Sequence, residues 1–405
     1  MKKYNIPFSP PDISEEEINE VIDTLKSGWI TTGPKTKELE RRLSEFTDTP
    51  KTVCLNSATA ALELTLRVLG IGEGDEVIVP AMTYTASCSV IYHVGAKAVI
   101  VDIAEDSHEM DYDALADAIT ENTKAVIPVD LAGIPCDYDR IFEVVESKKH
   151  LFKARGEYQE KLGRVAVVAD GAHALGSTYK GKKIGSVADF TTFSFHAVKN
   201  FTTAEGGSVT WKENPNFDNE ELYREYQIYS LHGQTKDALA KTKAGSWEYD
   251  IVIPGYKCNL TDIAASIGLV QLDRYPKLLE RRENIINQYN KGFGGTRITA
   301  LSHSSDDYKS CGHLYITHVE GATFEQRGEI IVKMAERGIS CNVHYKPLPL
   351  LTAYKNLGFD IENYPNAYNY YVKEITLPLH TRLSDEDVAV IISNFKEIVE
   401  EVVGE

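Results

Sequence analysis

The sequence predicts an α/β protein: a large domain with a mainly parallel central sheet flanked by helices, followed by a smaller C-terminal α+β domain. From about residue 52, short apolar, β-branched runs alternate with stretches of helical periodicity, which is typical of strands covered by helices on both faces. After residue 259 this alternation gives way to a long helical stretch and then to mixed strands and helices. A chain of 405 residues, 42% of them hydrophobic, can bury the cores of two such domains.

The large domain, with an N-terminal arm, is predicted over residues 1–270. A helix is expected over residues 60–69. The expected strands cover residues 52–56, 76–80, 98–103, 123–129, 164–170, 188–195 and 206–211. The strongly charged stretch 146–162 is longer than a helix-to-strand connection requires and is interpreted as a solvated surface insertion.

The smaller domain is predicted over residues 271–405, and a helix over 261–293 is placed to link the two domains. Further helices are expected over 324–337 and 385–402, and strands over 313–319, 339–343 and 374–377. Ser384 is the expected N-cap of the last helix, with Asp387 three residues later as a variant of the capping box.

Composition and charge exclude several classes of protein. The formal net charge of −17 argues against nucleic acid as a partner, because a phosphate-backbone binder needs a basic face. No stretch approaches the roughly 20 apolar residues of a membrane helix, and no apolar run follows Met1-Lys2-Lys3, so neither membrane insertion nor a signal peptide is expected. A cytoplasmic protein is the prediction.

The cysteines support the same location. They form no C-x-x-C pair and have no histidines at metal-ligand spacing, which indicates reduced thiols, no metal site and no disulfide framework. The six are Cys54, Cys88, Cys136, Cys258, Cys311 and Cys341.

An acid and an amine are expected in one crevice. Asp170 stands at the end of an apolar strand, where the carboxylate points into the crevice in which open α/β sheets bind ligands. Lys199 lies on a loop after a later strand, flanked by Ser and Gly residues, and can reach the same crevice. Pyridoxal 5'-phosphate (PLP) chemistry needs this pair: a lysine to form an imine and an anion to keep the pyridine nitrogen protonated. Alone, each is more often a cap or a solvated charge.

Three motifs extend the pattern: Ala169-Asp170-Gly171-Ala172-His173, Phe193-Ser194-Phe195-His196-Ala197-Val198-Lys199-Asn200 and Ala204-Glu205-Gly206-Gly207. With them the chain resembles, nearly end to end, the DegT/DnrJ/StrS family of PLP-dependent nucleotide-sugar aminotransferases, which have fold type I. The resemblance implies a PLP-binding large domain with Lys199 as the Schiff-base lysine and Asp170 at the pyridine nitrogen. It places His173, where relatives often have Gln, beside the ring hydroxyl. Relatives usually have Glu at 169 and Gly at 204, but neither change removes a catalytic atom.

The resemblance also implies further cofactor contacts. Ser194 would reach the cofactor phosphate, and Tyr84, in Pro80-Ala81-Met82-Thr83-Tyr84, would stack on the ring, although a lone Tyr is more often core. The run Asn56-Ser57-Ala58-Thr59-Ala60 reads from the residues alone as a helix N-cap or as a phosphate site at the positive end of a helix. By resemblance, Ser57, Ala58 and Thr59 would contact the PLP phosphate, chiefly the last two.

Gly255-Tyr256-Lys257-Cys258-Asn259 stands where many relatives carry G-Y-N-Y-R, a loop that reaches the cofactor phosphate of the neighbouring subunit. Lys257 replaces the usual Asn, and an ammonium binds phosphate at least as well as an amide. The resemblance therefore implies a homodimer with shared active sites.

Two further regions, residues 29–34 and 342–345, match segments that approach the sugar or the nucleotide in relatives. From the residues alone, the first can also be a plain Gly-Pro turn and the second part of a packed lobe. The candidate substrate-binding residues are Trp29, Thr31, Thr32, His344 and Tyr345.

The expected reaction moves an amino group from L-glutamate to a nucleotide-linked keto sugar, with PLP cycling through pyridoxamine 5'-phosphate. The runs Gly255-Tyr256-Lys257-Cys258-Asn259 and Asp170-Gly171-Ala172-His173 resemble those of family members that act on UDP-linked 4-keto-6-deoxy-N-acetylhexosamines, and this resemblance implies such a substrate, used for surface polysaccharide or glycan synthesis. Two alternatives stay open. A sugar dehydratase of the same family would have His in place of Lys199, and a non-catalytic regulatory or binding member would lack the lysine or add a DNA-binding segment.

Overall fold

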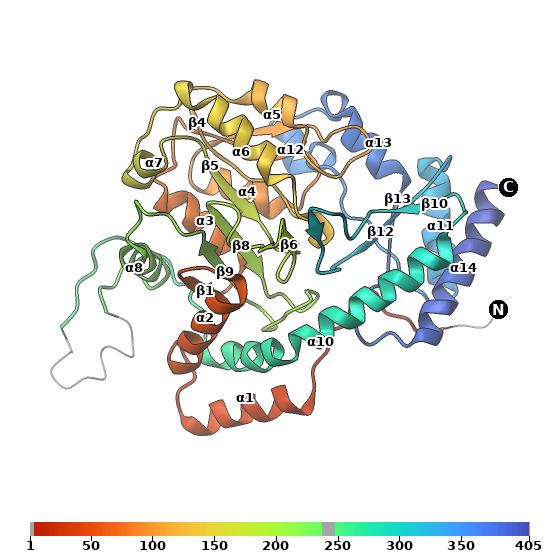
Figure 1. The fold of residues 1–405 in the computed structure, drawn as a ribbon, viewed down its shortest axis with the longest axis horizontal. Coiled ribbons are helices and arrows are strands. Elements are labelled where there is room, and N and C mark those ends of the chain that lie inside the picture. The colour runs from red at the N-terminus through yellow and green to blue at the C-terminus, as the bar shows by residue number, and fades with distance from the viewer. Residues whose placement is uncertain (1–3, 237–247, 405) are drawn as a thin grey trace.

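A seven-stranded sheet forms the centre of the large domain in the computed structural model, which describes residues 4–236 and 248–404 (Figure 1). The strand order is β1-β9-β8-β5-β4-β2-β3; β9 runs antiparallel to both of its neighbours, and the other pairs are parallel. The predicted mainly parallel sheet is confirmed. The strands are β1 (Thr52–Leu55), β2 (Glu76–Pro80), β3 (Lys97–Val101), β4 (Thr123–Val126), β5 (Ala166–Asp170), β8 (Phe190–Ser194) and β9 (Gly207–Trp211).

Helices cover both faces of this sheet because successive strand residues point to opposite sides. On β2, Val77 and Val79 join the core under α3, α4 and α8, whereas Ile78 joins the core under α2, α5, α6 and α10. The strands therefore need apolar residues at nearly every position, which is the pattern read from the sequence. These helices are α2 (Pro34–Thr47), α3 (Ala58–Val68), α4 (Thr85–His93), α5 (Tyr112–Ala118), α6 (Tyr138–Ser147), α8 (Asn219–Ser230) and α10 (Asp262–Phe293).

The C-terminal lobe has its own core around an antiparallel sheet of order β10-β12-β13. The 32-residue helix α10 runs from the large sheet to this lobe (Figure 1), so the predicted boundary between residues 270 and 271 falls inside one helix and stays a prediction. The capping box of Ser384 and Asp387 at the last helix is confirmed. The lobe contains β10 (Ile298–Ala300), β12 (Tyr315–Val319), β13 (Glu374–Leu377), α11 (Phe324–Glu336), α12 (Thr352–Asn356), α13 (Pro365–Lys373) and α14 (Asp385–Val403).

Smaller elements complete the fold. A third sheet of order β11-β6-β7 pairs a strand that follows α10 with a hairpin of the large domain. The elements are α1 (Glu15–Ser27), α7 (Glu157–Leu162), β6 (Thr178–Tyr179), β7 (Lys182–Lys183), β11 (Tyr308–Lys309) and the 3-10 turns η1 (Leu131–Gly133), η2 (Lys149–Leu151), η3 (Leu348–Leu350) and η4 (Ile361–Asn363).

The N-terminal arm ties the lobes together. Tyr4 donates its backbone N–H to the Arg337 carbonyl oxygen at 2.8 Å, and Ser9 donates its hydroxyl to the Val198 carbonyl oxygen at 3.0 Å. The arm thus runs from the small lobe to the residue before Lys199. Residues 1–3, at the start of the segment in which no signal peptide is expected, lie outside the described residues.

The strand predicted over 339–343 is wrong. The segment makes only isolated bridges, one of them between Asn342 and Thr376. The backbone donors of this segment go to different parts of the chain, because the Ser340 N–H binds the Ile6 carbonyl oxygen and the Asn342 N–H binds the Thr376 carbonyl oxygen, each at 3.0 Å. The Val343 N–H binds a side chain, Asn342 Oδ1, at 2.8 Å, so no continuous ladder forms.

The interpretation of 146–162 as a solvated insertion is also wrong for its second half. Helix α7 buries Tyr158 and Gln159, and the Gln159 amide donates to the Leu69 carbonyl oxygen at 2.7 Å. The charge pattern concealed this because the two buried residues stand among exposed charged ones.

In the described part of the chain, no helix is both long enough and apolar enough to span a bilayer.

Candidate active site

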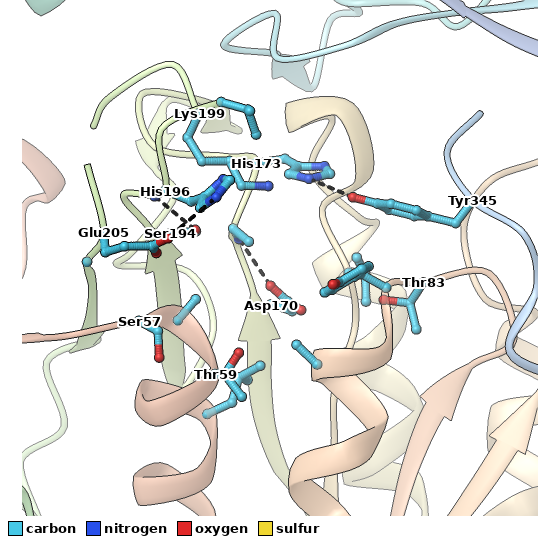
Figure 2. Close-up of a pocket in the computed structure, with 18 residues that line it drawn as sticks. Ser57, Thr59, Thr83, Asp170, His173, Ser194, His196, Lys199, Glu205 and Tyr345 are labelled. Atoms are coloured by element: carbon cyan, nitrogen blue, oxygen red, sulfur yellow. Dashed lines mark hydrogen bonds and ion pairs between the residues drawn. The ribbon is translucent and has the colours of Figure 1, made fainter. Parts of the chain in front are cut away.

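A cavity of about 370 Å³ opens at the carboxyl edge of the large sheet, between the start of α3, the start of α4 and the β8–β9 loop (Figure 2). Parallel strands β5 and β8 end there, so their terminal residues face the same space. The lining residues are Ser57, Ala58, Thr59, Leu62, Thr83, Tyr84, Ala86, Val129, Asp170, Ala172, His173, Ser194, His196, Val198, Lys199, Glu205, Gly206 and Tyr345.

Asp170 is the last residue of β5 and is 6% exposed. Its Oδ2 accepts the Ser87 hydroxyl at 2.6 Å and its Oδ1 accepts the Ala172 N–H at 3.1 Å. Burial raises the pKa of Asp170, and these two hydrogen bonds together with the charge of Lys199 offset only part of that rise. A further cation placed beside Asp170 would therefore stabilise its ionised form.

Lys199 extends into the cavity from the β8–β9 loop (Figure 2). The neighbouring Asn200 anchors this loop, since its amide donates to the Cys311 carbonyl oxygen at 2.9 Å and its Oδ1 lies 2.9 Å from His313 Nδ1. Burial lowers the pKa of Lys199 to about 8, against the opposing effect of the Asp170 charge. An amine with this pKa takes up and releases protons near neutral pH.

His173 lies between two aromatic side chains, with its ring centroid 4.3 Å from that of His313 and 6.1 Å from that of Tyr345. Its Nδ1 accepts the Ala132 N–H at 3.3 Å, so in the neutral ring Nε2 carries the proton and donates to Tyr345 Oη at 3.2 Å. Burial, and next the charge of Lys199, place the pKa of His173 well below its ordinary value. The ring is therefore a neutral hydrogen-bond donor.

The start of α3 forms the opposite wall. Ser57 caps the helix by accepting the Ala60 N–H at 3.1 Å, and Ala58 and Thr59 begin its first turn, where backbone N–H groups have no partner within the helix. Strand β9 passes so close that a Cβ on Gly207 would lie 2.3 Å from the Ala58 nitrogen. Glycine at 207 thus keeps this turn in place, with free backbone N–H groups of the kind that can hold an anion.

The structure brings together nine of the predicted site residues on this one cavity: Ser57, Ala58, Thr59, Tyr84, Asp170, His173, Ser194, Lys199 and Tyr345. Tyr84 is 60% exposed at the rim, with its ring 5.8 Å from that of Tyr345.

The other five predicted residues lie off the cavity. Lys257 is exposed and donates to Asn259 Oδ1. Trp29 donates its indole N–H to the Thr32 carbonyl oxygen at 3.2 Å, and Thr31 accepts the Asp262 N–H at 3.1 Å.

Two of those five have buried polar groups that are already engaged. The Thr32 hydroxyl donates to the Leu260 carbonyl oxygen, and His344 Nδ1 lies 2.9 Å from the Thr376 hydroxyl. Their assignment to substrate stays a prediction.

Sequence reasoning missed the residues that support the site rather than line it. Ser87 binds Asp170 across 83 positions, and His313 packs on His173 while it contacts Asn200. No spacing in the sequence signals either contact, because both depend on how α4 and the segment before β12 pack against the sheet edge.

Comparisons with known proteins identify relatives of this chain. The sequence model of the DegT/DnrJ/EryC1/StrS aminotransferase family matches residues 11–396. The spore coat polysaccharide biosynthesis protein SpsC of Bacillus subtilis is 39% identical over 407 residues, which are 98% of each chain.

Solved structures match as well. Spr1654 of Streptococcus pneumoniae, described as a sugar aminotransferase, matches with a TM-score of 0.96 in both a PMP form (69% identity) and a PLP form (67%), over 98% of this chain and all of that one. PseC of Helicobacter pylori, an aminotransferase of pseudoaminic acid biosynthesis, is 29% identical with a TM-score of 0.85, over 98% of this chain and 100% of its own.

Proposed function

We propose that this chain, which belongs to the DegT/DnrJ/EryC1/StrS aminotransferase family, moves the amino group of L-glutamate onto a nucleotide-linked keto sugar. It is a PLP-dependent sugar aminotransferase that cycles through pyridoxamine 5'-phosphate. The single observation that carries the proposal is the placement of Lys199 and Asp170 on one cavity beside the first turn of α3.

The chemistry of the lining residues fits PLP. Lys199 would hold the aldehyde carbon covalently, and Asp170 would face the pyridine nitrogen. His173 would give its Nε2–H, which donates to Tyr345 Oη in the cofactor-free site, to the ring hydroxyl instead, and Tyr84 would cover the ring. The phosphate would lie at the first turn of α3 with Ser57, Ala58, Thr59 and Ser194. The bound cofactor supplies an electron sink that stabilises negative charge on the carbon bearing the amino group.

Lys199 is proposed to carry the protons in both half-reactions. With a pKa of about 8, its amine accepts a proton from the donor carbon at neutral pH and returns one at the opposite end of the same transfer. Asp170, held by Ser87 and the Ala172 N–H, would present its negative charge to the pyridine nitrogen. His173 stays neutral, so it donates a hydrogen bond without adding charge.

A homodimer with shared active sites is part of the proposal. Among the described lining residues Lys199 is the sole lysine and there is no arginine, while Asp170 and Glu205 are acidic, so the phosphate needs a cation from elsewhere. Lys257 of a second copy would supply it. Large side chains around this loop are 38–50% exposed, as expected of a surface that a second subunit covers. They are Tyr249, Ile251, Val252 and Tyr256.

Mixing two inactive variants tests the sharing of sites. Lys199→Ala and Lys257→Ala subunits, unfolded together and refolded, should form heterodimers in which one of two sites has both lysines. Turnover should then rise to about a quarter of the wild-type value, because half of the dimers are mixed. No gain on mixing, with dimers confirmed by ultracentrifugation, would contradict sharing.

The substrate proposal is a UDP-linked 4-keto-6-deoxy-N-acetylhexosamine for surface polysaccharide or glycan synthesis. It draws support from the described roles of SpsC in spore coat polysaccharide and of PseC in pseudoaminic acid synthesis. Trp29, Thr31, Thr32, His344 and Tyr345 are the proposed substrate residues, of which Tyr345 lines the cavity. Six free thiols agree with a reducing, cytoplasmic location.

Incubation with L-glutamate and a panel of nucleotide keto sugars, followed by mass spectrometry, tests the reaction. The proposal predicts an amino sugar from the UDP-linked 4-ketone and 2-oxoglutarate in equal amount. Loss of a ring oxygen without gain of nitrogen would instead favour a dehydratase of the family, a reaction that the presence of Lys199 argues against.

A further inference from the structure

Two buried hydroxyl groups lead from the cavity wall to Asp170. Ser87 Oγ lies 2.6 Å from Asp170 Oδ2, and Thr83 Oγ1 lies 2.7 Å from Ser87 Oγ. Thr83 lines the cavity, whereas Ser87 stands one helical turn later in α4, and their exposures are 1% and 0%. The mechanism above gives no part to Thr83 and leaves open why a serine holds Asp170.

The direction of the two hydrogen bonds follows from the number of protons. An ionised carboxylate can only accept, so the Ser87 hydroxyl donates its one proton to Asp170. Ser87 Oγ must then accept from Thr83, whose hydroxyl proton points to Ser87. Thr83 thereby fixes the rotation of the Ser87 hydroxyl.

The geometry of α4 supports a dedicated contact. A serine in a helix commonly turns its hydroxyl back to the carbonyl four residues earlier, which would be that of Thr83. Here the hydroxyl reaches across to the end of β5 instead. The start of α4 is fixed from its other side too, because Thr85 Oγ1 lies 2.7 Å from Tyr354 Oη.

The charge of Asp170 depends on few groups. Burial favours the neutral acid, and three groups favour the anion: the Ser87 hydroxyl, the Ala172 N–H and the charge of Lys199. The Lys199 charge changes during catalysis, because the amine gains and loses protons. Ser87 and the Ala172 N–H are the two that stay constant through the cycle.

We propose that Ser87, oriented by Thr83, is a positioning residue that keeps the Asp170 carboxylate ionised and in a single rotation toward the pyridine nitrogen. This inference rests on the proposed assignment of Asp170 to that nitrogen. Ser87 acts through Asp170, because it lies behind that residue and does not line the cavity.

The test compares the PLP-loaded dimers of wild type, Ser87→Ala, Ser87→Thr and Asp170→Asn. Ser89→Ala is the matched control, since Ser89 lies in the same helix but donates to the Ala86 carbonyl oxygen. The readout is the pH midpoint of the absorbance of the Lys199-bound cofactor. A second readout is the nitrogen-15 shift of PLP labelled at the ring nitrogen.

Ser87→Ala should move the absorbance midpoint in the same direction as Asp170→Asn and by less. Without the Ser87 hydrogen bond, a smaller fraction of Asp170 is ionised and the ring nitrogen is less protonated. The nearby Lys199 nitrogen is then easier to protonate. The midpoint should therefore rise by on the order of one pH unit, the worth of one hydrogen bond to a charged group. The nitrogen-15 shift should move toward the unprotonated ring, Ser87→Thr should restore both signals, and Ser89→Ala should match wild type.

The inference would be overturned if PLP-loaded Ser87→Ala had the same absorbance midpoint and the same nitrogen-15 shift as the wild type. If Ser87→Ala does not fold, Thr83→Val, which removes the orienting donor, should shift the midpoint in the same direction, and an unchanged midpoint there would overturn it. If wild type forms no covalent link with PLP, or if Asp170→Asn leaves both signals unchanged, the proposed function fails instead, so the two failures are distinguishable.

Discussion

Two buried aspartates stand at opposite edges of the same sheet and meet opposite surroundings. Asp189 comes just before β8, at the amino edge, and accepts two hydrogen bonds from Arg164 at 2.6 and 2.9 Å, with Lys212 Nζ at 2.8 Å. Asp170, at the carboxyl edge, has one hydroxyl, one N–H and the charge of Lys199.

The same burial therefore has opposite results. Burial alone would raise the pKa of Asp189, but Arg164 and Lys212 hold it below its ordinary value, whereas the pKa of Asp170 stays raised. A fully paired carboxylate stabilises the fold, and an incompletely paired one is available to a ligand. The amino edge of this sheet thus holds a carboxylate paired with two cations, whereas the carboxyl edge holds one that lines the cavity.

The largest effect should separate the two lysines. Lys199→Ala should lower turnover by roughly 10⁴-fold or more, since proton transfer alone contributes about 10² to 10⁴. It should still bind pyridoxamine 5'-phosphate, as equilibrium dialysis can measure. Lys212→Ala, the matched change beside Asp189, should keep its turnover per folded molecule. Substantial turnover in Lys199→Ala would refute the role of that amine.

The two aspartates themselves should respond in opposite ways. Asp189→Asn should lower the free energy of unfolding by about 3–5 kcal/mol, because it removes the buried carboxylate that accepts two hydrogen bonds from Arg164 and leaves that arginine only the partly exposed Glu146 as an ion-pair partner. Asp170→Asn should keep or raise the stability of the cofactor-free protein and lower turnover by about 10²- to 10³-fold. Urea unfolding and steady-state rates measure both. Equal losses of stability in the two variants would break the comparison.

The pH dependence of those stabilities has a defined sign. Asp189, whose pKa is lowered, stabilises the protein above its unfolded pKa of 3.8, and this contribution is lost as pH falls further. Asp170, whose pKa is raised, becomes more costly to the fold as pH rises above 3.8. The stability of Asp170→Asn relative to wild type should therefore grow as pH rises from that point, as urea unfolding at several pH values can show.

A smaller effect should appear in the capture of PLP by the cofactor-free protein. This step needs a neutral amine, so its rate should rise with pH to a midpoint near 8 rather than 10.5. Asp170→Asn removes the charge that raises the pKa of Lys199 and should move the midpoint below 8. Stopped-flow absorbance measures both, and a midpoint near 10 in wild type would show that Lys199 is not desolvated.

Much of the fold could be predicted because local pattern and burial agree. Strand β2 was expected over 76–80 and begins and ends there, since both of its faces are buried and every residue after Glu76 is apolar or Pro. Asp170 and Lys199 could be predicted as a pair because parallel strands end at one edge.

The failures share a cause, which is polar contact between distant residues. The segment 339–343 has strand-like residues, yet the Ser340 N–H donates to Ile6 and the Asn342 N–H donates to Thr376, which lie in two different parts of the chain. Gln159 is buried because its amide meets the Leu69 carbonyl oxygen 90 positions away, and Ser87 supports Asp170 in the same manner. Contacts of this kind produce no periodic pattern in the sequence.

The covalent link between Lys199 and PLP is the central claim, and borohydride reduction followed by peptide mapping tests it most directly. The PLP-loaded protein should lose its long-wavelength absorbance on reduction and carry one phosphopyridoxyl mass per chain on the peptide that contains Lys199. A phosphopyridoxyl group on another lysine, or no labelled peptide from a protein saturated with PLP, would contradict the account.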